Sequence, residues 1–314
     1  MPSPESNAGD TGLRLTERRN PATGSLDLAT PREIVRAISA EDATVSAAVA
    51  AAEDQITEAV ILVEAAFRAG GRLVYVGAGT SGRLGVLDAV ECPPTFGTPP
   101  GMVIGVIAGG PPALVRAVEG AEDHPGQGAA SMDEQAVGSS DVVIGIAASG
   151  ITPFVRGALA RASERAARTV FLTCSDPPVE LRQGCDVCIV IRTGPEVVTG
   201  STRMKAGTAT KMVLNTLTTA AMIRIGKTYG NLMVDLVATN AKLADRGERI
   251  VMEVGGVDRE RARWAIAEAG GSVRTAVVIA RTGVDREEAE RQLASHDNRL
   301  RAIIGDPPAV PTYD

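Results

Sequence analysis

The stretch from Arg72 to Cys92, RLVYVGAGTSGRLGVLDAVEC, decides the fold. An apolar run from Leu73 to Val76 leads into the glycine-rich turn Gly77–Gly82, and an apolar-periodic segment then continues to Glu91. This order predicts a strand, a turn and a helix. Glycines let the backbone approach a ligand closely, and the first amides of a helix are unpaired donors with partial positive charge. The turn therefore predicts a phosphate site.

The same turn matches the pattern G-x-G-x-x-G, but two features of a nucleotide site are missing. No acidic residue ends the next predicted strand, which continues into glycines and a proline at 109–111, and no Gly-Lys-Ser/Thr follows the turn. The hydroxyls of Thr80 and Ser81 suit a phosphate monoester better than a pyrophosphate. A helix cap without any ligand is the alternative for this stretch.

The composition narrows the function classes. The chain has 314 residues, a formal net charge of −6 and 3% aromatic residues, which disfavours nucleic acid and anionic membranes as partners. No signal peptide or long apolar span is found, so we expect a cytoplasmic protein. With two histidines and one CxxC pair at the start of a predicted strand, we expect no metal or cofactor, and we expect free thiols at Cys92, Cys174, Cys185 and Cys188.

From residue 72 onward, short apolar runs alternate with helical patterns. We predict strands at 73–76, 102–108, 142–147, 169–173 and 187–191, and helices between them at 82–89, 112–122, 132–137 and 153–166. Prolines at 93 and 94 are expected to stop the first of these helices. The alternation is typical of an α/β fold in which a parallel sheet is covered on both faces, and ligands of such sheets bind beyond the carboxyl ends of the strands.

The two ends of the chain are different in character. Residues 1–28 are polar and aperiodic and predict a flexible arm, although 16–20 could dock. Thr30 and Glu33 form a capping box that starts a helix, and an Ala-rich helix follows at 41–69. Beyond a long helix at 204–225, we predict helices at 232–253, 258–268, 273–281, 286–293 and 297–304.

Three glycine- and hydroxyl-rich loops lie at predicted strand ends, each opening a helix. Their candidate ligand residues are Gly79, Thr80 and Ser81 in the first, Ser149, Gly150 and Thr152 in the second, and Ser201, Thr202, Arg203 and Lys205 in the third. The loops could converge on one phosphate, with an arginine or lysine of the third loop supplying positive charge. The alternative is that each hydroxyl only caps its own helix.

Several carboxylates stand close to these loops in the sequence. Glu91 ends the helix that the first turn begins, Glu119 and Glu122 would share one face of a helix, and Glu196 precedes the third loop. Carboxylates near a phosphosugar suit proton transfers at carbon or to a leaving oxygen. Spacing alone does not choose among them. His124 is either a ring-opening aid or an exposed residue at a helix end.

Six segments carry a resemblance to a known family: LTERRNPAT, VGAGTSGRLGVLDAVECPPTFG, AVEGAED, GIAASGITPFV, EVVTGSTRMKAGTATKMVLN and YGNLMVDLVATNAKL. With them the chain resembles the N-acetylmuramic acid 6-phosphate etherases, which are built on the sugar-isomerase (SIS) fold. The resemblance implies a three-layer parallel sheet in flavodoxin-like order. It also implies a phosphosugar lyase that removes D-lactate, with net hydration, and gives N-acetylglucosamine 6-phosphate without a metal or nucleotide.

The resemblance also implies residue roles. Glu91 of the ECPP motif is the proton donor of the family, and Glu122, the second glutamate of VEGAE, is the other acid/base residue. Our hypothesis is that Glu122 removes the C2 proton while Glu91 serves the leaving oxygen and the water. Glu196 stands where SIS isomerases carry a base, which suits contact with C1 or C2 of the substrate. The pair Pro111-Pro112 looks like a departure from the family pattern.

The resemblance further implies a homodimer with a shared active site, for which the N-terminal helices and residues 17–19 are candidate contacts. We expect an arm with helices at 1–55, a SIS phosphosugar-binding domain at 56–226 and a helical region at 227–314. Two alternatives remain. A phosphosugar-sensing regulatory SIS protein would not require both glutamates, and an aldose-ketose phosphosugar isomerase would use Glu196 and a histidine instead of the ECPP glutamate.

Overall fold

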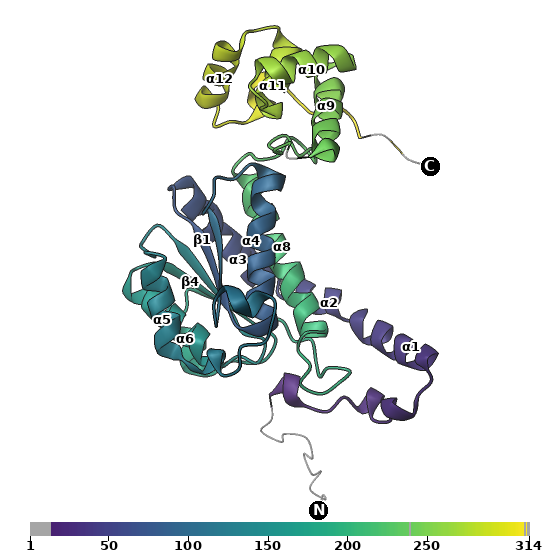
Figure 1. Cartoon of the computed structure of the whole chain (residues 1–314), viewed down its shortest axis with the longest axis vertical. Coiled ribbons are helices and arrows are strands. Elements are labelled where there is room, and N and C mark those ends of the chain that lie inside the picture. The colour runs from purple at the N-terminus through teal and green to yellow at the C-terminus, as the bar shows by residue number, and fades with distance from the viewer. Residues whose placement is uncertain (1–13, 239, 311, 313–314) are drawn as a thin grey trace, which may run out of the picture. The chain divides into compact units, whose positions relative to one another are not determined.

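The computed structural model describes residues 14–238, 240–310 and 312, and its centre is a five-stranded sheet (Figure 1). The strand order is β2-β1-β3-β4-β5, and the pairs β1–β3, β3–β4 and β4–β5 are parallel. The strands are β1 (Leu73–Gly77), β2 (Val103–Ile107), β3 (Val142–Ile146), β4 (Arg168–Thr173) and β5 (Val187–Val190). The predicted strands and their flavodoxin-like order are confirmed.

Helices cover both faces of the sheet, which makes three layers (Figure 1). Val74 and Val143 pack in one buried cluster with Val155 of α6 (Pro153–Glu164), and α5 (Pro125–Glu134) adds Met132 to it. Tyr75, whose side chain points to the opposite face, meets α4 (Gly79–Phe96), and α3 (Glu53–Arg68) and α8 (Lys205–Arg224) lie on that side too. Since both faces are covered, every residue of β1 and β3 is buried.

Helix α4 is longer than predicted at both ends. The expectation that Pro93 and Pro94 stop it is wrong, because the helix continues through both to Phe96. A proline keeps a φ that suits a helix and removes only its own N–H donor, so two prolines in the last turn do not end it. The helix ends before Gly97, which has a φ of 57° and donates its N–H to the carbonyl of Pro93.

The predicted helix at 112–122 is also wrong. Residues 111–123 form two short 3-10 turns, η4 (Pro111–Leu114) and η5 (Ala121–Asp123), with irregular chain between them. The prolines at 111 and 112 have no N–H to donate, and Gly120 adopts a left-handed φ of 70° just before Glu122. The common helical face that we expected for Glu119 and Glu122 therefore does not form.

The N-terminal part that the structure describes is docked. Residues 1–13 of the predicted flexible arm lie outside the described residues, but 14–28 form the 3-10 turns η1 (Leu15–Glu17), η2 (Pro21–Thr23) and η3 (Leu26–Leu28). Thr16 is fully buried, so the expectation of a flexible arm is wrong for this part. The residues around Thr16 could not show where the segment docks, because the hydrogen-bond partners of Thr16 lie more than 150 residues away in the sequence.

The predicted capping box is confirmed at the start of α1 (Pro31–Asp42), where the Thr30 hydroxyl accepts the Glu33 N–H and the Glu33 carboxylate accepts the Thr30 N–H. The single helix expected at 41–69 is instead divided into the end of α1, α2 (Val45–Ala50) and α3. The Thr44 hydroxyl bonds to the carbonyl of Glu41 at the first break. No residue of α1 is buried.

The C-terminal helices share their own apolar core. They are α9 (Ala241–Gly255), α10 (Arg259–Glu268), α11 (Val273–Thr282), α12 (Arg286–Ser295) and α13 (Leu300–Ile304), while a short α7 (Val179–Gln183), which was not predicted, precedes β5. The helix predicted from 232 begins at 241, because the Asn240 side chain caps it by accepting the Leu243 N–H. No helix of the described residues is both long and apolar enough to span a membrane.

Contacts divide the described chain into two compact units. One contains residues up to 89 and 104–217, and the other contains 90–103 and the chain from 218 onward. The domain limits expected from the sequence, at 55/56 and 226/227, stay a prediction.

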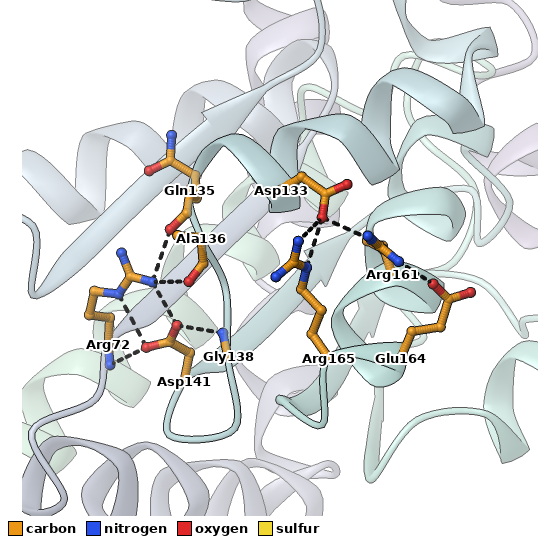
Figure 2. A network of polar contacts seen from close by, with 9 residues as sticks. All are labelled: Arg72, Asp133, Gln135, Ala136, Gly138, Asp141, Arg161, Glu164 and Arg165. Atoms are coloured by element: carbon orange, nitrogen blue, oxygen red, sulfur yellow. Dashed lines mark hydrogen bonds and ion pairs between the residues drawn. The ribbon is translucent and has the colours of Figure 1, made fainter.

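An ion pair between the half-buried Arg72 and the buried Asp141 fixes the amino ends of β1 and β3 (Figure 2). The guanidinium and backbone N–H of Arg72 both donate to the Asp141 carboxylate, which also accepts the Gly138 N–H at 3.1 Å. Burial raises the pKa of Asp141, but these hydrogen bonds outweigh burial and hold the pKa below its usual value. Figure 2 also shows Asp133, a more exposed carboxylate paired with Arg161 and Arg165.

We expect Asp141→Asn to lower the free energy of unfolding by about 3 kcal/mol at pH 7, because Arg72 and the Gly138 N–H lose their anionic acceptor. A carboxyl group with a lowered folded pKa stabilises above its unfolded pKa of about 3.9, and this contribution disappears as the pH falls through the folded pKa. Urea unfolding at pH 7 and pH 3 measures both effects. Asp133→Asn is the matched control and should cost much less; an equal cost would contradict the prediction.

Candidate active site

The first predicted phosphate loop lies at the carboxyl end of β1. Helix α4 begins at Gly79, whose φ is 52°, so the amides of Gly79, Thr80 and Ser81 form the open first turn of a helix. A Cβ added at Gly207 of α8 would lie 3.6 Å from Thr80 Cγ2. The first turns of α4 and α8 are therefore neighbours, which brings the first and third loops together.

The second loop follows β3 and opens α6. Gly150 adopts a φ of 85°, and a Cβ there would meet Thr173 at the end of β4. Thr152 is the N-cap residue of α6, but its side chain makes no capping hydrogen bond, so that hydroxyl is not used by its own helix. Ser149 is half-buried. The capping alternative thus fails for Thr152.

The docked N-terminal segment joins the third loop to the loop that follows β4. The Thr16 carbonyl accepts the Gly200 N–H at 3.2 Å, while the hydroxyl of Ser175, in the loop after β4, lies 3.3 Å from the Thr16 hydroxyl. Thr16 and Ser175 were missed as site-building residues. The only signal for Thr16 was the LTERRNPAT motif, and Ser175 stood in none of the matching segments.

Glu196 is engaged by α8. Its carboxylate is fully buried and accepts the backbone N–H of Lys205 at 3.0 Å and that of Ala206 at 2.9 Å. A carboxylate at a helix N-terminus satisfies open donors and favours the positive end of the helix dipole. Glu196 therefore occupies the anion position that the first turn of α8 would otherwise offer to a phosphate.

The two cations of the third loop differ in position. The Lys205 side chain is 2% exposed and its Nζ lies 2.5 Å from the Glu41 carboxylate, a contact that lowers the pKa of Glu41. Arg203 is exposed, and the neighbouring Ser201 and Thr202 are half-buried. The charge of Lys205 is thus already balanced within the chain, whereas Arg203 faces solvent.

Glu122 and the first loop face one cavity. A space of ≈ 160 Å³ is lined by Gly79 and Arg83 of α4 and by Glu119 and Glu122 of the irregular segment. Although the expected helix does not form, the irregular segment still places both residues, which are exposed, in the lining of this space. The lining of the cavity thus combines two features. A helix terminus attracts phosphate, and glutamate carboxylates can accept protons. Arg83 was not singled out from the sequence.

Glu91 and His124 lie apart from this cavity. Glu91 is exposed and stands 12 residues after Gly79 on α4, or roughly 18 Å along the helix axis. It does not line the cavity that holds Glu122. His124 is exposed at the start of α5 and makes no capping bond there. Of the two family glutamates, Glu122 thus lines the cavity and Glu91 is not among its lining residues.

The cysteines are free thiols, as predicted. Cys92 and Cys174 are buried, and burial raises the pKa of Cys174 to about 12 and that of Cys185 to about 11. Such thiols are poor nucleophiles and poor metal ligands near neutral pH. Among the described residues, no group of three or more His, Cys, Asp or Glu side chains is placed to hold a metal ion.

The chain is similar to several known proteins. Residues 55–163 match the family model for the glucokinase regulatory protein N-terminal SIS domain. The N-acetylmuramic acid 6-phosphate etherase of Mycolicibacterium smegmatis is 51% identical over 94% of this chain and 99% of its own length, and that of Edwardsiella ictaluri is 52% identical over 93% and 97%. The solved structure of phosphoheptose isomerase from Neisseria gonorrhoeae matches 61% of this chain and 98% of its own at 18% identity, with a TM-score of 0.47.

The sheet order and the hydroxyl-rich loops at its carboxyl edge, together with the family-model match, define an α/β protein of the SIS type. At half identity over nearly the whole chain, the protein belongs to the N-acetylmuramic acid 6-phosphate etherase family. The family expected from the sequence motifs is confirmed. The roles of individual site residues stay predictions.

Proposed function

We propose that this protein is a carbon–oxygen lyase that removes D-lactate from the C3 ether of N-acetylmuramate 6-phosphate and yields N-acetylglucosamine 6-phosphate. The observation that carries the proposal is the cavity shared by Gly79 and Glu122. A reaction on a phosphosugar needs a site that holds the phosphate and a carboxylate close to the reacting carbons. The open amides of α4 supply the first, and Glu122 supplies the second.

The phosphate is held by the three loops. Amides and hydroxyls of Gly79, Thr80 and Ser81 contribute from the first, and Ser149, Gly150 and Thr152 from the second. Ser201, Thr202 and Arg203 contribute from the third, where the exposed guanidinium offers the bidentate geometry that phosphate prefers. Glu196 and Lys205 would act through the shape of the α8 terminus instead of direct charge, an assignment supported by the contact of the Glu196 carboxylate with the Lys205 N–H and by the pairing of Lys205 with Glu41.

The chemistry proceeds by elimination and hydration. In the open-chain sugar, the C1 aldehyde makes the C2 proton acidic, and the Glu122 carboxylate removes it. The electrons of the C2–H bond first form an enolate with the C1 carbonyl. The enolate then gives a C2–C3 double bond and restores the C1 aldehyde as the C3–O bond breaks, and Glu91 donates the proton that the lactate oxygen takes up. Water then adds to C3 while C2 regains a proton, so the sum of the steps is hydrolysis of the ether.

We infer that the working enzyme is a homodimer whose partner supplies Glu91 to the cavity that holds Glu122. Two observations support this. Glu91 lies roughly 18 Å from Gly79 along the axis of α4 in its own chain. It is exposed and therefore available to a second copy. Helix α1 is amphipathic without burying any residue, and Val35 on it is 62% exposed, which suits a helix that packs in a symmetric interface.

We also place the reaction in the cytoplasm, in the recycling of cell-wall amino sugars. The four free cysteines support a reducing compartment, where thiols persist without forming disulfides. The substrate named by the family is a phosphorylated cell-wall sugar acid, so the product sugar phosphate would enter amino sugar catabolism.

The alternatives have weaker support. An isomerase would use Glu196 as its base, but both oxygens of that carboxylate accept backbone N–H groups of α8. A regulatory protein that only senses phosphosugars is favoured by the family model at 55–163, but that match covers a smaller part of the chain than the etherase relatives do.

The direct test is incubation of purified protein with N-acetylmuramate 6-phosphate in H₂¹⁸O, followed by mass spectrometry of both products. We expect equal amounts of D-lactate and N-acetylglucosamine 6-phosphate, with ¹⁸O in the sugar and none in the lactate, because the C3–O bond is the one that breaks. N-Acetylmuramate without phosphate is the control and should react far more slowly. Absence of lactate would rule out the etherase activity, and label in the lactate would rule out the elimination.

A further inference from the structure

The segment that carries Glu122 has few connections of its own. Between residues 110 and 123 the backbone hydrogen bonds are all local, each spanning three or four residues. Apolar contacts are supplied by Ala113, which is buried, and by Ala121, which packs against the core of the sheet. Turns of this kind do not fix a side chain to the accuracy that proton transfer requires.

Arg83 makes the two hydrogen bonds that tie this segment to a distant part of the chain. Its Nε donates to the carbonyl of Leu114 and its Nη2 to that of Arg116, both at 3.3 Å. In the part of the chain that the structure describes, these are the hydrogen bonds that join residues 110–123 to anything beyond their own turns. One guanidinium thus holds the end of η4 and the residues directly after it, which lead on to η5 and Glu122.

The position of Arg83 shows which parts of the site these hydrogen bonds connect. It stands on α4 four residues after Gly79, so it belongs to the same rigid helix that presents the first phosphate loop. It also lines the cavity with Glu119 and Glu122, and it is the one cation among the lining residues described for that cavity. The distance from the phosphate amides to the Glu122 carboxylate therefore depends on Arg83.

We propose that Arg83 is a positioning residue that fixes the Glu122 loop relative to the phosphate-binding turn of α4. The inference rests on the proposed etherase reaction and on Glu122 acting in it. Arginine is required because its planar fork donates in two directions at once, whereas lysine offers a single ammonium on a flexible stem. A loop displaced by about 1 Å would hold the substrate as before but present the base poorly, so the effect falls on kcat.

The test is a double-mutant cycle between Arg83→Lys and Glu122→Gln, measured as kcat and KM for lactate release. We expect Arg83→Lys to lower kcat by roughly 10²-fold with KM changed less than about threefold. The double variant should be no slower than Glu122→Gln alone, because a base that is absent cannot be misplaced. If Arg83→Lys is not recovered folded, Arg83→Gln takes its place in the same cycle.

Arg72→Lys is the matched control. Arg72 also donates to two carbonyls, those of Gln135 and Ala136, but at the amino ends of the strands, away from the cavity. We expect its kcat to stay within about twofold of wild type even where its melting temperature falls. Additive losses in the cycle, an effect on KM alone, or an equal loss in Arg72→Lys would overturn the proposal. Wild-type protein that releases no lactate would instead overturn the proposed function.

Discussion

Glu122→Gln is expected to lower the rate of exchange of the substrate C2 proton by roughly 10²- to 10⁴-fold. The rate of lactate release should fall by the same factor. Glutamine keeps the shape of the side chain but lacks the charge that accepts a proton. Exchange precedes breakage of the C3–O bond, so removal of the C2 base stops both events. The measurement is deuterium incorporation at C2 in D₂O, followed by NMR, beside a separate assay for lactate.

Glu91→Gln should separate the two events. Because Glu91 is proposed to protonate the leaving oxygen, this variant should still exchange the C2 proton while lactate release falls by a similar factor. Glu119→Gln is the matched control, since Glu119 lines the same cavity as Glu122 and has no assigned proton transfer. We expect its rates within about tenfold of wild type. Exchange lost in Glu91→Gln and retained in Glu122→Gln would reverse the assignment.

The sheet was predictable from the sequence because its signals are local. Each strand is a short apolar run, and its limits in the structure differ from the predicted ones by only one or two residues. Gly79 and Gly150 could be expected in loops at strand ends because glycine tolerates positive φ values. Both residues adopt such values in the structure. The strand order could not be derived from these runs and came with the family resemblance.

The errors share another cause, namely competition between the helical period and the backbone preferences of single residues. The proline pair at 93–94 looked like a helix end, yet Gly97 ends α4. The apolar spacing at 112–122 looked helical, yet the prolines at 111–112 and Gly120 break it into turns. In both places the helical period was present and the backbone chemistry of single residues decided the outcome.

The candidate site residues could be chosen from the sequence, but the hydrogen bonds and ion pairs that they make could not be predicted from it. The hydroxyls, the arginine and the glutamates could be chosen from loops and motifs. No local pattern indicated that Lys205 pairs with Glu41, that Glu196 caps α8 or that Thr16 bridges to Gly200. Each of these contacts joins a residue to a partner that only the fold brings near.

The proposed shared active site predicts that two different inactive subunits restore activity when they are paired. If Glu91 and Glu122 at one cavity come from different chains, a heterodimer of Glu91→Gln and Glu122→Gln has one cavity with both substitutions and one with neither. Such a heterodimer should regain about half of the wild-type rate, although each parent homodimer is nearly inactive. Co-expression with two affinity tags and purification on both isolates it.

The reciprocal pairing makes the test decisive. A wild-type subunit joined to one that carries both substitutions would have, in a shared site, one missing glutamate at each cavity, so we expect almost no lactate release. If each chain supplied both glutamates to its own cavity, the results would exchange: the first heterodimer would be inactive and the second half active. The roughly 18 Å of helix between Gly79 and Glu91 favours the shared arrangement, because a helix cannot fold back on itself.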